Sequence, residues 1–402
     1  MDKLDLVSYI PAAFRSFPAY LQQHIHHARN PWSFFEYYQN APDSIHTIMP
    51  LFWTSLTLTY VLGLVTGNVS QIDRQWTFLP IAYSLHFVLY PLFNNNGEAF
   101  LHNLPRLCLM WSLMVVWGVR LTAHTARRGL YNFFDEDYRW QIWRDQLPTW
   151  LFQLFHLGFI AIAQSLLLAA MSLPYQNVLL TPRPTQSSSA LGLPYGLGAT
   201  DVILTVLTLL TIYTQFMADN QQYHFQTYKQ HVKKSQSQDD INVNIPRNVT
   251  TYKQGPFDIT WTPKDAQRGF ITKGLWAWSR HPNFACEMTF WALQGLFPLL
   301  SASFGSVGAG LTVGEKRGMV LPSPIIPAIA YSCLFIASTW FTESITAPKY
   351  PAYKSYQALV GQFAPQVTVF KGIISLLLGT RTRLAEELGW VGSRDVKGKK
   401  VQ

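Results

Sequence analysis

Charged side chains are scarce in this chain of 402 residues. Only 13% of the residues are Asp, Glu, Lys or Arg, whereas soluble domains average about 25%. Hydrophobic residues make up 49% and aromatic residues 15%, which excludes a disordered tail, a coiled coil and a typical cytosolic enzyme. The formal net charge is nevertheless +9. Nucleic-acid binders carry dense clusters of Lys and Arg, so this composition favours a membrane protein whose few cations lie on one side.

Cysteine is also rare. The three cysteines, Cys108, Cys286 and Cys333, are widely spaced and form no CxxC pair. An odd and scattered set of this kind excludes a disulfide framework and a paired-cysteine metal site. We therefore expect no resident metal ion. Cys108 and Cys333 lie in apolar runs, and we interpret them as buried, inert thiols.

Long apolar runs dominate the chain, and a spanning helix needs about 20 such residues. The predicted fold is therefore all-α: a polytopic membrane protein with about seven transmembrane helices. An eighth stretch, Val367 to Leu378, is too short to cross and is predicted to lie at the membrane interface. The seven predicted spans are Ile45 to Gly67, Trp76 to Phe93, Leu104 to Ala123, Thr149 to Leu173, Ala199 to Ala218, Phe284 to Ala302 and Ile325 to Thr342.

The cations are concentrated in three segments, 123–148, 229–280 and 349–400. With seven spans, all three segments fall on the same side of the membrane, and the positive-inside rule makes that side cytosolic. The N-terminus is then lumenal and the C-terminal tail cytosolic. Asn68 and Asn248 begin glycosylation sequons, but both lie on the cytosolic side in this topology. We therefore predict that neither is glycosylated.

The end of the chain carries Lys399 and Lys400 at the fourth and third positions from the terminus. This pair resembles the dilysine retrieval signal of endoplasmic reticulum membrane proteins, an address that a receptor reads on a cytosolic tail. The alternative is a frayed basic end. We divide the chain into an N-terminal lumenal or interfacial segment (1–44), a transmembrane domain (45–366), and an interfacial helix with a basic tail (367–402).

Polar residues are costly inside a bilayer, so clusters at the ends of spans indicate candidate sites. The first cluster follows the third span and contains Arg120, Arg127 and Arg128, with an acidic stretch from Asp135 to Asp137. Arg120 lies inside an apolar helix and needs a partner or a watery cavity. A guanidinium matches phosphate oxygens in a bidentate manner, so the cluster is a candidate phosphate site. The alternative is a charge-balanced loop that fixes helix ends.

The second cluster ends the fifth span. Gln215 and Asp219 are four residues apart and share one helix face, whereas Gln221 lies off that face. An amide and an acid at this depth suit the hydroxyls of a ribose or another sugar. The alternative is an ordinary helix end leaving the membrane.

The third cluster is the densest and extends from Gly274 to Glu287. Pro282 favours an extended His281 before it and starts a helix. Helix N-termini attract anions, so Arg280, His281 and the helix start are a candidate phosphate cradle, with Asn283 offering amide donors. Glu287 lies one turn after Asn283, just inside an apolar span. The alternative is a structural loop with aromatic anchors.

The run from Gly274 to Phe284 resembles the signature of membrane proteins with the steroid 5-alpha-reductase C-terminal fold, the DUF1295 group, whose relatives include the sterol C14- and C24-type reductases. The resemblance extends from about Arg120 to Pro365. It implies a helical bundle with a cytosol-facing cofactor pocket and the NADPH-dependent reduction of a carbon–carbon double bond in a lipid. The further matching residues are Ala218-Asp219-Asn220-Gln221, Phe225, Lys349-Tyr350-Pro351, Tyr353, Tyr356-Gln357, Phe363 and Pro365.

The resemblance also implies roles for individual residues. The family usually has Gly before its Glu, where this chain has Ala285 and Cys286. Its acidic and tyrosine catalytic pair has no clear match, and Glu98 and Tyr138 are our candidates. The implied cofactor-binding residues are Asp219 and Gln215 at the nicotinamide-ribose half, Arg120 and Arg128 at the phosphates, Arg280, His281, Asn283 and Glu287 along the pocket, and Tyr353 closing it.

The leading hypothesis is an NADPH-dependent reductase of a sterol-like or other enone lipid. It needs a lipid substrate and the membrane as partners, and no nucleic acid. Membrane methyltransferases that use S-adenosylmethionine share a similar Arg-His-Pro motif, but they usually lack an acid one turn later, so Glu287 favours a reductase. A lipid-binding membrane protein without activity is the third hypothesis, and the departure at Ala285 and Cys286 keeps it open.

Overall fold

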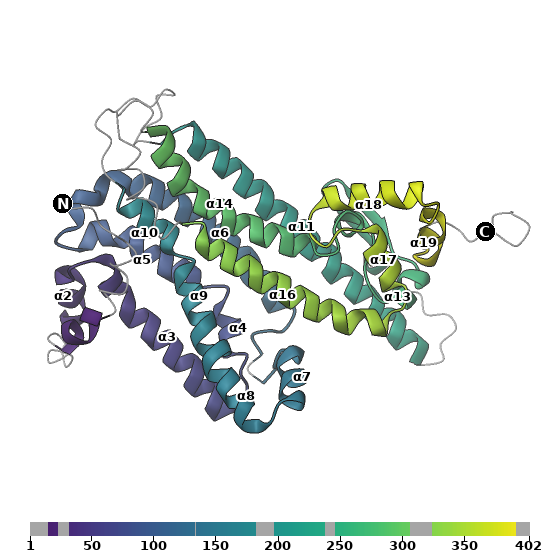
Figure 1. Ribbon diagram of the computed structural model, residues 1–402, viewed down its shortest axis with the longest axis horizontal. Helices are drawn as coiled ribbons and strands as arrows, with labels where there is room; N and C mark the ends of the chain where they lie inside the picture. Colours follow the sequence, from purple (N-terminus) through teal and green to yellow (C-terminus); the bar gives the residue numbers. More distant parts are fainter. Residues whose placement is uncertain are drawn as a thin grey trace, which may run out of the picture. The chain divides into compact units, whose positions relative to one another are not determined.

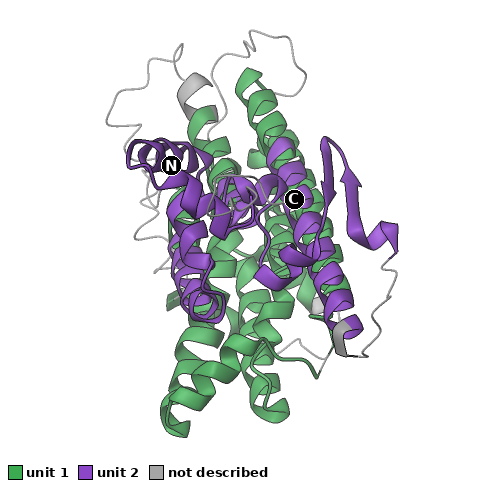
Figure 2. Ribbon diagram, turned by 90° about the vertical axis from the view of Figure 1, so that its right-hand side faces the viewer, with its two compact units in different colours: residues 1–209, 291–331 green, residues 210–290, 332–402 purple. Residues whose placement is uncertain are grey.

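The computed structural model describes residues 15–22, 32–132, 134–181, 197–237, 246–305 and 324–390. These residues are mostly helical (Figure 1). The chain divides into two compact units, each drawn from two stretches of sequence (Figure 2). Unit 1 combines residues 1–209 and 291–331, and unit 2 combines residues 210–290 and 332–402. The predicted dilysine signal at Lys399 and Lys400 lies outside the described residues.

Unit 1 consists of apolar helices joined by short turns. Its elements are α2 (Trp32–Asn40), α3 (Ser44–Thr66), α4 (Gln71–Gln75), α5 (Leu79–Phe93), the 3-10 helix η1 (Gly97–Asn103), α6 (Leu104–Arg127), α7 (Tyr138–Gln146), α8 (Thr149–Phe155), the π-helix η2 (His156–Ala163), α9 (Gln164–Ala170) and α10 (Leu173–Leu179). α3 begins at Asp43, whose carboxylate accepts the N–H groups of Ile45 and His46, as N-cap residues do. It ends at Gly67, which has a φ of 67° that glycine adopts without steric cost.

Buried polar groups connect the helices of unit 1. The hydroxyl of Tyr175 on α10 donates to the carbonyl of Met110 on α6 at 2.9 Å. Asp201 is buried and receives a two-pronged ion pair from Arg106, at 2.8 and 3.0 Å. Such paired groups are tolerated inside a low-dielectric interior because their charges and hydrogen bonds are satisfied.

Unit 2 is built around parts of three long helices, α11 (Ala199–Ser237), α14 (Pro282–Gly305) and α16 (Ile326–Lys349). Shorter elements connect and follow them. These are α12 (Arg247–Thr250), β1 (Thr251–Gln254), β2 (Phe257–Thr260), α13 (Pro263–Arg268), the 3-10 helix η4 (Gly274–Ala277), α17 (Tyr353–Leu359), α18 (Pro365–Leu377) and α19 (Arg381–Glu387).

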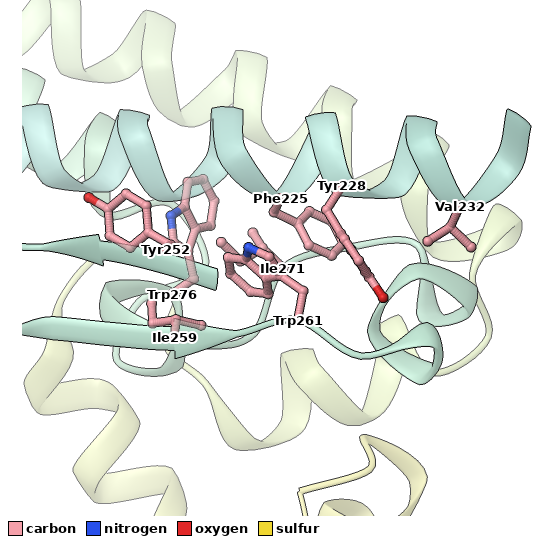
Figure 3. Packing of buried hydrophobic residues seen from close by; sticks show 8 residues of the cluster. All are labelled: Phe225, Tyr228, Val232, Tyr252, Ile259, Trp261, Ile271 and Trp276. Atoms are coloured by element: carbon pink, nitrogen blue, oxygen red, sulfur yellow. The ribbon is translucent and has the colours of Figure 1, made fainter. Parts of the chain in front are cut away.

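The hairpin of β1 and β2 departs from the all-α prediction, because the sequence pattern indicates no strand in the long segment after the fifth predicted span. The strands pair in antiparallel register, with Tyr252 opposite Ile259. Both side chains are buried against α11, beside Phe225 and Trp261 (Figure 3). Gly255 makes the tight turn possible because its φ is 57°, a conformation that glycine adopts readily.

Four described helical stretches are long and apolar enough to cross a membrane: Ser44–Thr66, Gly97–Arg127, Thr149–Leu179 and Ala199–Ser235. They contain nearly all of the first, third, fourth and fifth predicted spans. The second predicted span forms α5, which has 15 residues and falls short of a crossing. The sixth and seventh lie within α14 and α16, so seven crossings remain a prediction.

The burial predicted for two cysteines is wrong. Cys108 and Cys333 are exposed, and Cys286 is half-buried. An apolar run indicates a buried side chain only when the surroundings are water. On a membrane helix the apolar residues also face outward, because lipid is as apolar as the core.

Candidate functional site

Two rungs of polar side chains join α11 to α14 within unit 2. The side-chain amide of Gln215 donates to the carboxylate of Glu287, and the amide of Asn283 donates to Asp219 at 3.2 Å. Each helix contributes two residues four positions apart, which place both on one face. The residue spacing predicts these two shared faces, and the structure confirms them. We call these four residues the polar ladder.

The polar ladder is buried although it lies between apolar helices. The side chains of Gln215 and Glu287 are each only 3% exposed. The amide oxygens of Gln215 and Asn283 are buried and accept no hydrogen bond from the described residues. A buried polar atom without a partner costs about 1–3 kcal/mol, so these two oxygens are positioned to accept hydrogen bonds from a ligand.

A third amide extends the polar ladder along α11. The oxygen of Gln221 accepts the backbone N–H of Leu275 at 2.9 Å, while its nitrogen is buried without a partner among the described residues. Gly274 permits this approach, because a Cβ at that position would lie 2.5 Å from the Gln221 oxygen. The Gly-Leu-Trp start of the third sequence cluster therefore packs directly against α11.

The turn before α14 is held by a loop from the C-terminal part of unit 2. The backbone N–H groups of Arg280 and His281 donate to the carbonyls of Gly361 and Gln362, at 2.9 and 3.0 Å. Pro282 then occupies the first position of α14, where its missing N–H costs nothing. The helix therefore begins at the proline, as the sequence predicts.

The side chain of Arg280 is committed to a buried ion pair. Its Nε and Nη2 donate to the two oxygens of Glu343 at 2.8 and 3.0 Å. Its Nη1 donates to the carbonyls of Gln357 and Val360 at 3.4 and 2.5 Å. All three nitrogens are thus engaged inside the protein. This geometry makes Arg280 a positioning residue for the turn rather than an open phosphate ligand.

Glu343 is the centre of this second group of residues, the Arg280 cluster. Besides Arg280, its carboxylate accepts hydrogen bonds from His281 at 2.8 Å, Tyr353 at 3.1 Å and Gln357 at 2.9 Å. Burial alone would raise the pKa of Glu343, but the bonds from His281 and Arg280 outweigh it and hold the pKa well below its usual range. The carboxylate is therefore ionised near neutral pH.

Tyr353 and Glu343 show what the sequence indicated and what it missed. The resemblance implies that Tyr353 closes a pocket, and in the structure its buried hydroxyl donates to Glu343. Glu343 was not among the candidates. A sequence signal existed, because Glu343 directly follows the end of an apolar span, and acidic residues at span ends indicate candidate sites.

A hollow of about 520 Å³ lies further along α11, lined by His224, Arg247, Asn248, Thr251, Tyr252 and Lys253. Hydrogen bonds connect its wall to the polar ladder region. The oxygen of Gln254 accepts the amide of Asn220 at 2.8 Å and the hydroxyl of Tyr252 at 2.9 Å. The indole of Trp261 donates to Nδ1 of His224 at 2.8 Å. Arg247 and Lys253 place two cationic side chains along the wall of the hollow.

Four predicted site residues lie in unit 1. Arg120 is buried within α6, and Arg128 caps the C-terminal end of that helix with an exposed side chain. Glu98 is exposed in η1 and Tyr138 is exposed at the start of α7. No hydrogen bond joins Glu98 to Tyr138 in the part of the chain that the structure describes. Their catalytic roles remain predictions.

Comparison with known proteins identifies relatives of this chain. The family model described as "Protein of unknown function (DUF1295)" matches residues 59–360. An uncharacterized protein of Schizosaccharomyces pombe is 31% identical over 335 residues, which cover 82% of this chain and 83% of that protein. No solved structure matches. The family match includes both the polar ladder and Glu343.

Proposed function

The chain belongs to the DUF1295 family of proteins of unknown function, and we propose that this member is an NADPH-dependent reductase of a carbon–carbon double bond. Its substrate is a sterol-like or other enone lipid. It acts as a multi-pass protein of the endoplasmic reticulum membrane with about seven crossings and a cytosolic C-terminus. The burial of charged and amide side chains in the polar ladder is the observation that carries this proposal.

The polar ladder fits the amide and hydroxyl groups of a nicotinamide riboside. Asp219 and Glu287 supply acceptors for ribose hydroxyls. The unpartnered amide oxygens of Gln215 and Asn283 suit the N–H donors of a carboxamide. A purely structural contact between two apolar helices would be better served by apolar side chains, because buried unpaired polar atoms lower stability.

The phosphates of the dinucleotide require cations that the protein has not already paired. Arg280 is committed to Glu343, so we assign it to positioning the turn before α14. Arg247 and Lys253 at the hollow are the phosphate ligands that we propose within unit 2. Among the described residues Lys253 forms an ion pair with Asp258, and both side chains are 63% exposed, so this weak surface pair can open. The family resemblance also implies phosphate roles for Arg120 and Arg128.

Bound NADPH supplies a hydride to one carbon of the substrate double bond. The protein residues orient the cofactor and exclude water. A proton for the second carbon must come from an acid of this chain, and Tyr138 and Glu98 are our proposed donors. Neither assignment depends on the polar ladder, so each can be tested separately by substitution.

A thermal-shift measurement on the full-length protein in lipid nanodiscs tests the proposal. A ligand that binds only the folded state stabilises it by about 2.7 kcal/mol at a concentration of one hundred times Kd. We expect NADPH to raise the unfolding temperature and S-adenosylmethionine to leave it unchanged. The reverse result would establish the methyltransferase hypothesis. If neither ligand changes the unfolding temperature and the protein still binds lipid, the result would indicate a lipid-binding role.

Two variants locate the cofactor. Asp219→Ala removes an acceptor of the polar ladder, and Lys253→Ala removes a cation of the hollow. Both should weaken NADPH binding by about tenfold, the equivalent of about 1.4 kcal/mol. Lys264→Ala is the matched control, because Lys264 is an exposed lysine on α13 outside the hollow. Equal affinity in all three variants would exclude the proposed site.

A further inference from the structure

In the helix α18, polar side chains face the protein and apolar side chains face outward, the reverse of a surface helix in a soluble protein. The covered positions are Thr368, Lys371, Gly372 and Ser375, which follow the i, i+3, i+4, i+7 spacing of one helix face. The outward side chains are large and apolar: Phe370 is 63% exposed and Leu377 is 82% exposed. The other outward residues of this face are Val367, Val369, Ile373, Ile374, Leu376 and Leu378, the last just beyond the helix.

The next helix, α19, has the ordinary arrangement. Its outward positions are Arg381, Thr382, Arg383 and Glu387, and its covered positions are Ala385 and Leu388 at its end. The two helices follow one another in unit 2 (Figure 1). An apolar face next to a charged one matches the change from acyl chains to headgroups at the surface of a membrane.

The length of α18 limits how it can contact lipid. Its 13 residues extend about 20 Å at 1.5 Å per residue. The hydrocarbon core of a bilayer is about 30 Å thick. The helix is therefore too short to cross, and only an orientation in the plane of the membrane places its whole apolar face in lipid.

The covered face of α18 is bonded to the loop that holds the Arg280 cluster. The hydroxyl of Thr368 accepts the N–H of Gly361 at 2.8 Å and donates to the carbonyl of Trp278. The ammonium of Lys371 donates to the carbonyl of Gln357 at 2.6 Å. Arg280 donates to that same carbonyl, so a residue of α18 and a residue of the site share an acceptor.

We propose that α18 is an in-plane membrane helix whose contact with lipid holds the Arg280 turn in its ordered form. The apolar face seats in the acyl region, and Thr368 and Lys371 transmit that position to Gln357 and Gly361. Removing α18 from the membrane loosens the loop and with it the start of α14. This membrane-facing surface exists whichever ligand the polar ladder binds, so its test is independent of the proposed reductase activity.

The first experiment measures where α18 lies. Spin labels are attached to Phe370→Cys, Leu377→Cys and, as the control, Thr382→Cys, in full-length protein whose three native cysteines are replaced by Ala. In nanodiscs that contain anionic phospholipid, we expect oxygen to relax the labels at 370 and 377 more than a water-soluble nickel chelate does. The label at 382 should show the opposite preference. The proposal is overturned if the chelate reaches the labels at 370 and 377. It is also overturned if neither oxygen nor the chelate reaches them, because that result indicates a protein partner on this face.

The second experiment measures the coupling. Leu377→Glu places a charge on the outward face without touching the loop, and Thr382→Glu adds the same charge on α19. In nanodiscs we expect Leu377→Glu to accelerate hydrogen exchange of the Arg280 and His281 amides by about tenfold, because those amides donate to Gly361 and Gln362. Thr382→Glu should leave exchange unchanged. The coupling is overturned if Leu377→Glu moves α18 out of the lipid and hydrogen exchange of the Arg280 and His281 amides stays unchanged.

Discussion

Glu343→Gln is the substitution that most sharply tests the structure of the site. The side chain keeps its size and loses its charge. In the native protein the carboxylate accepts five hydrogen bonds, from Arg280 twice and from His281, Tyr353 and Gln357 once each. The glutamine amide retains one accepting oxygen, and its NH₂ group faces donors. The guanidinium of Arg280 is left buried without its counter-charge.

The expected loss of stability follows from this burial. Arg280 and Glu343 have side chains that are 7% and 8% exposed. Removing one partner of a buried ion pair costs about 3–5 kcal/mol, because the other charge remains desolvated. Asp258→Asn is the matched control, since it breaks an ion pair with Lys253 whose side chains are each 63% exposed. An exposed pair contributes about 0–1 kcal/mol.

A double-mutant cycle separates the ion pair from other effects of the substitution. The free energy of unfolding is measured in detergent for Arg280→Met, for Glu343→Gln and for the double variant. Either single variant leaves one charge of the pair buried without its partner, whereas the double variant removes both charges. The double variant should therefore lose less stability than the sum of the two single variants.

The pH of the measurement matters for Glu343. Because its pKa is lowered in the folded state by the bonds from His281 and Arg280, its contribution is present above the unfolded pKa of about 4.3. That contribution is lost as the pH falls toward the folded pKa. The cycle is therefore run near neutral pH. The difference in the free energy of unfolding between wild type and Glu343→Gln should become smaller in acid. A loss below about 1 kcal/mol at neutral pH, or additive single effects, would refute the reasoning.

Two further predictions concern glycine and glycosylation. Gly274→Ala should lower the free energy of unfolding by about 1–3 kcal/mol, because the φ of 65° and the approach of Gln221 leave no room for a Cβ. Gly372→Ala should raise it by up to about 1 kcal/mol, because a Cβ there meets nothing within 4 Å. Thermal unfolding compares the two variants. Asn248 is exposed and should carry no glycan, because the proposed topology places its segment in the cytosol; a glycosidase-sensitive mass shift at Asn248 would contradict that topology. Asn68 is uninformative for this test, because its amide is buried and donates to Asp135.

Local sequence patterns located the apolar parts of the long helices and the two shared faces of the polar ladder. The apolar run at the first span predicted α3 to within one residue at each end, because helix length and hydropathy are local properties. The spacing of Gln215 and Asp219 on one helix, and of Asn283 and Glu287 on another, predicted which side chains share a face. Their pairing across the two helices is a tertiary contact, and spacing alone does not specify it.

The Arg280 cluster required the structure because its partners are distant in sequence. Glu343 lies 63 residues after Arg280, and no local pattern joins them. An arginine before a helix N-terminus predicts an anion in general, and the chain supplies that anion from its own carboxylate. Because this carboxylate is distant in sequence, the local pattern predicts a phosphate ligand at Arg280.

The β-hairpin was missed although its local signals were present. Tyr252 and Ile259 are spaced so that both face the same side of a two-stranded ribbon, and Gly255 with Pro256 forms the turn. The strands have only four residues each, and strands this short produce a weak periodic signal. Packing of Tyr252 and Ile259 on α11 stabilises the hairpin, and that contact is again non-local.

Lipid profiling tests the central claim most directly, because the claim is that the polar ladder serves the reduction of a lipid double bond. Cells lacking the gene are compared with cells that express the wild-type protein or Asp219→Ala at equal levels. The account predicts that one unsaturated lipid accumulates in the deletion and in Asp219→Ala, and that the wild type restores its saturated product. Identical lipid profiles in all three strains, or full restoration by Asp219→Ala, would contradict it.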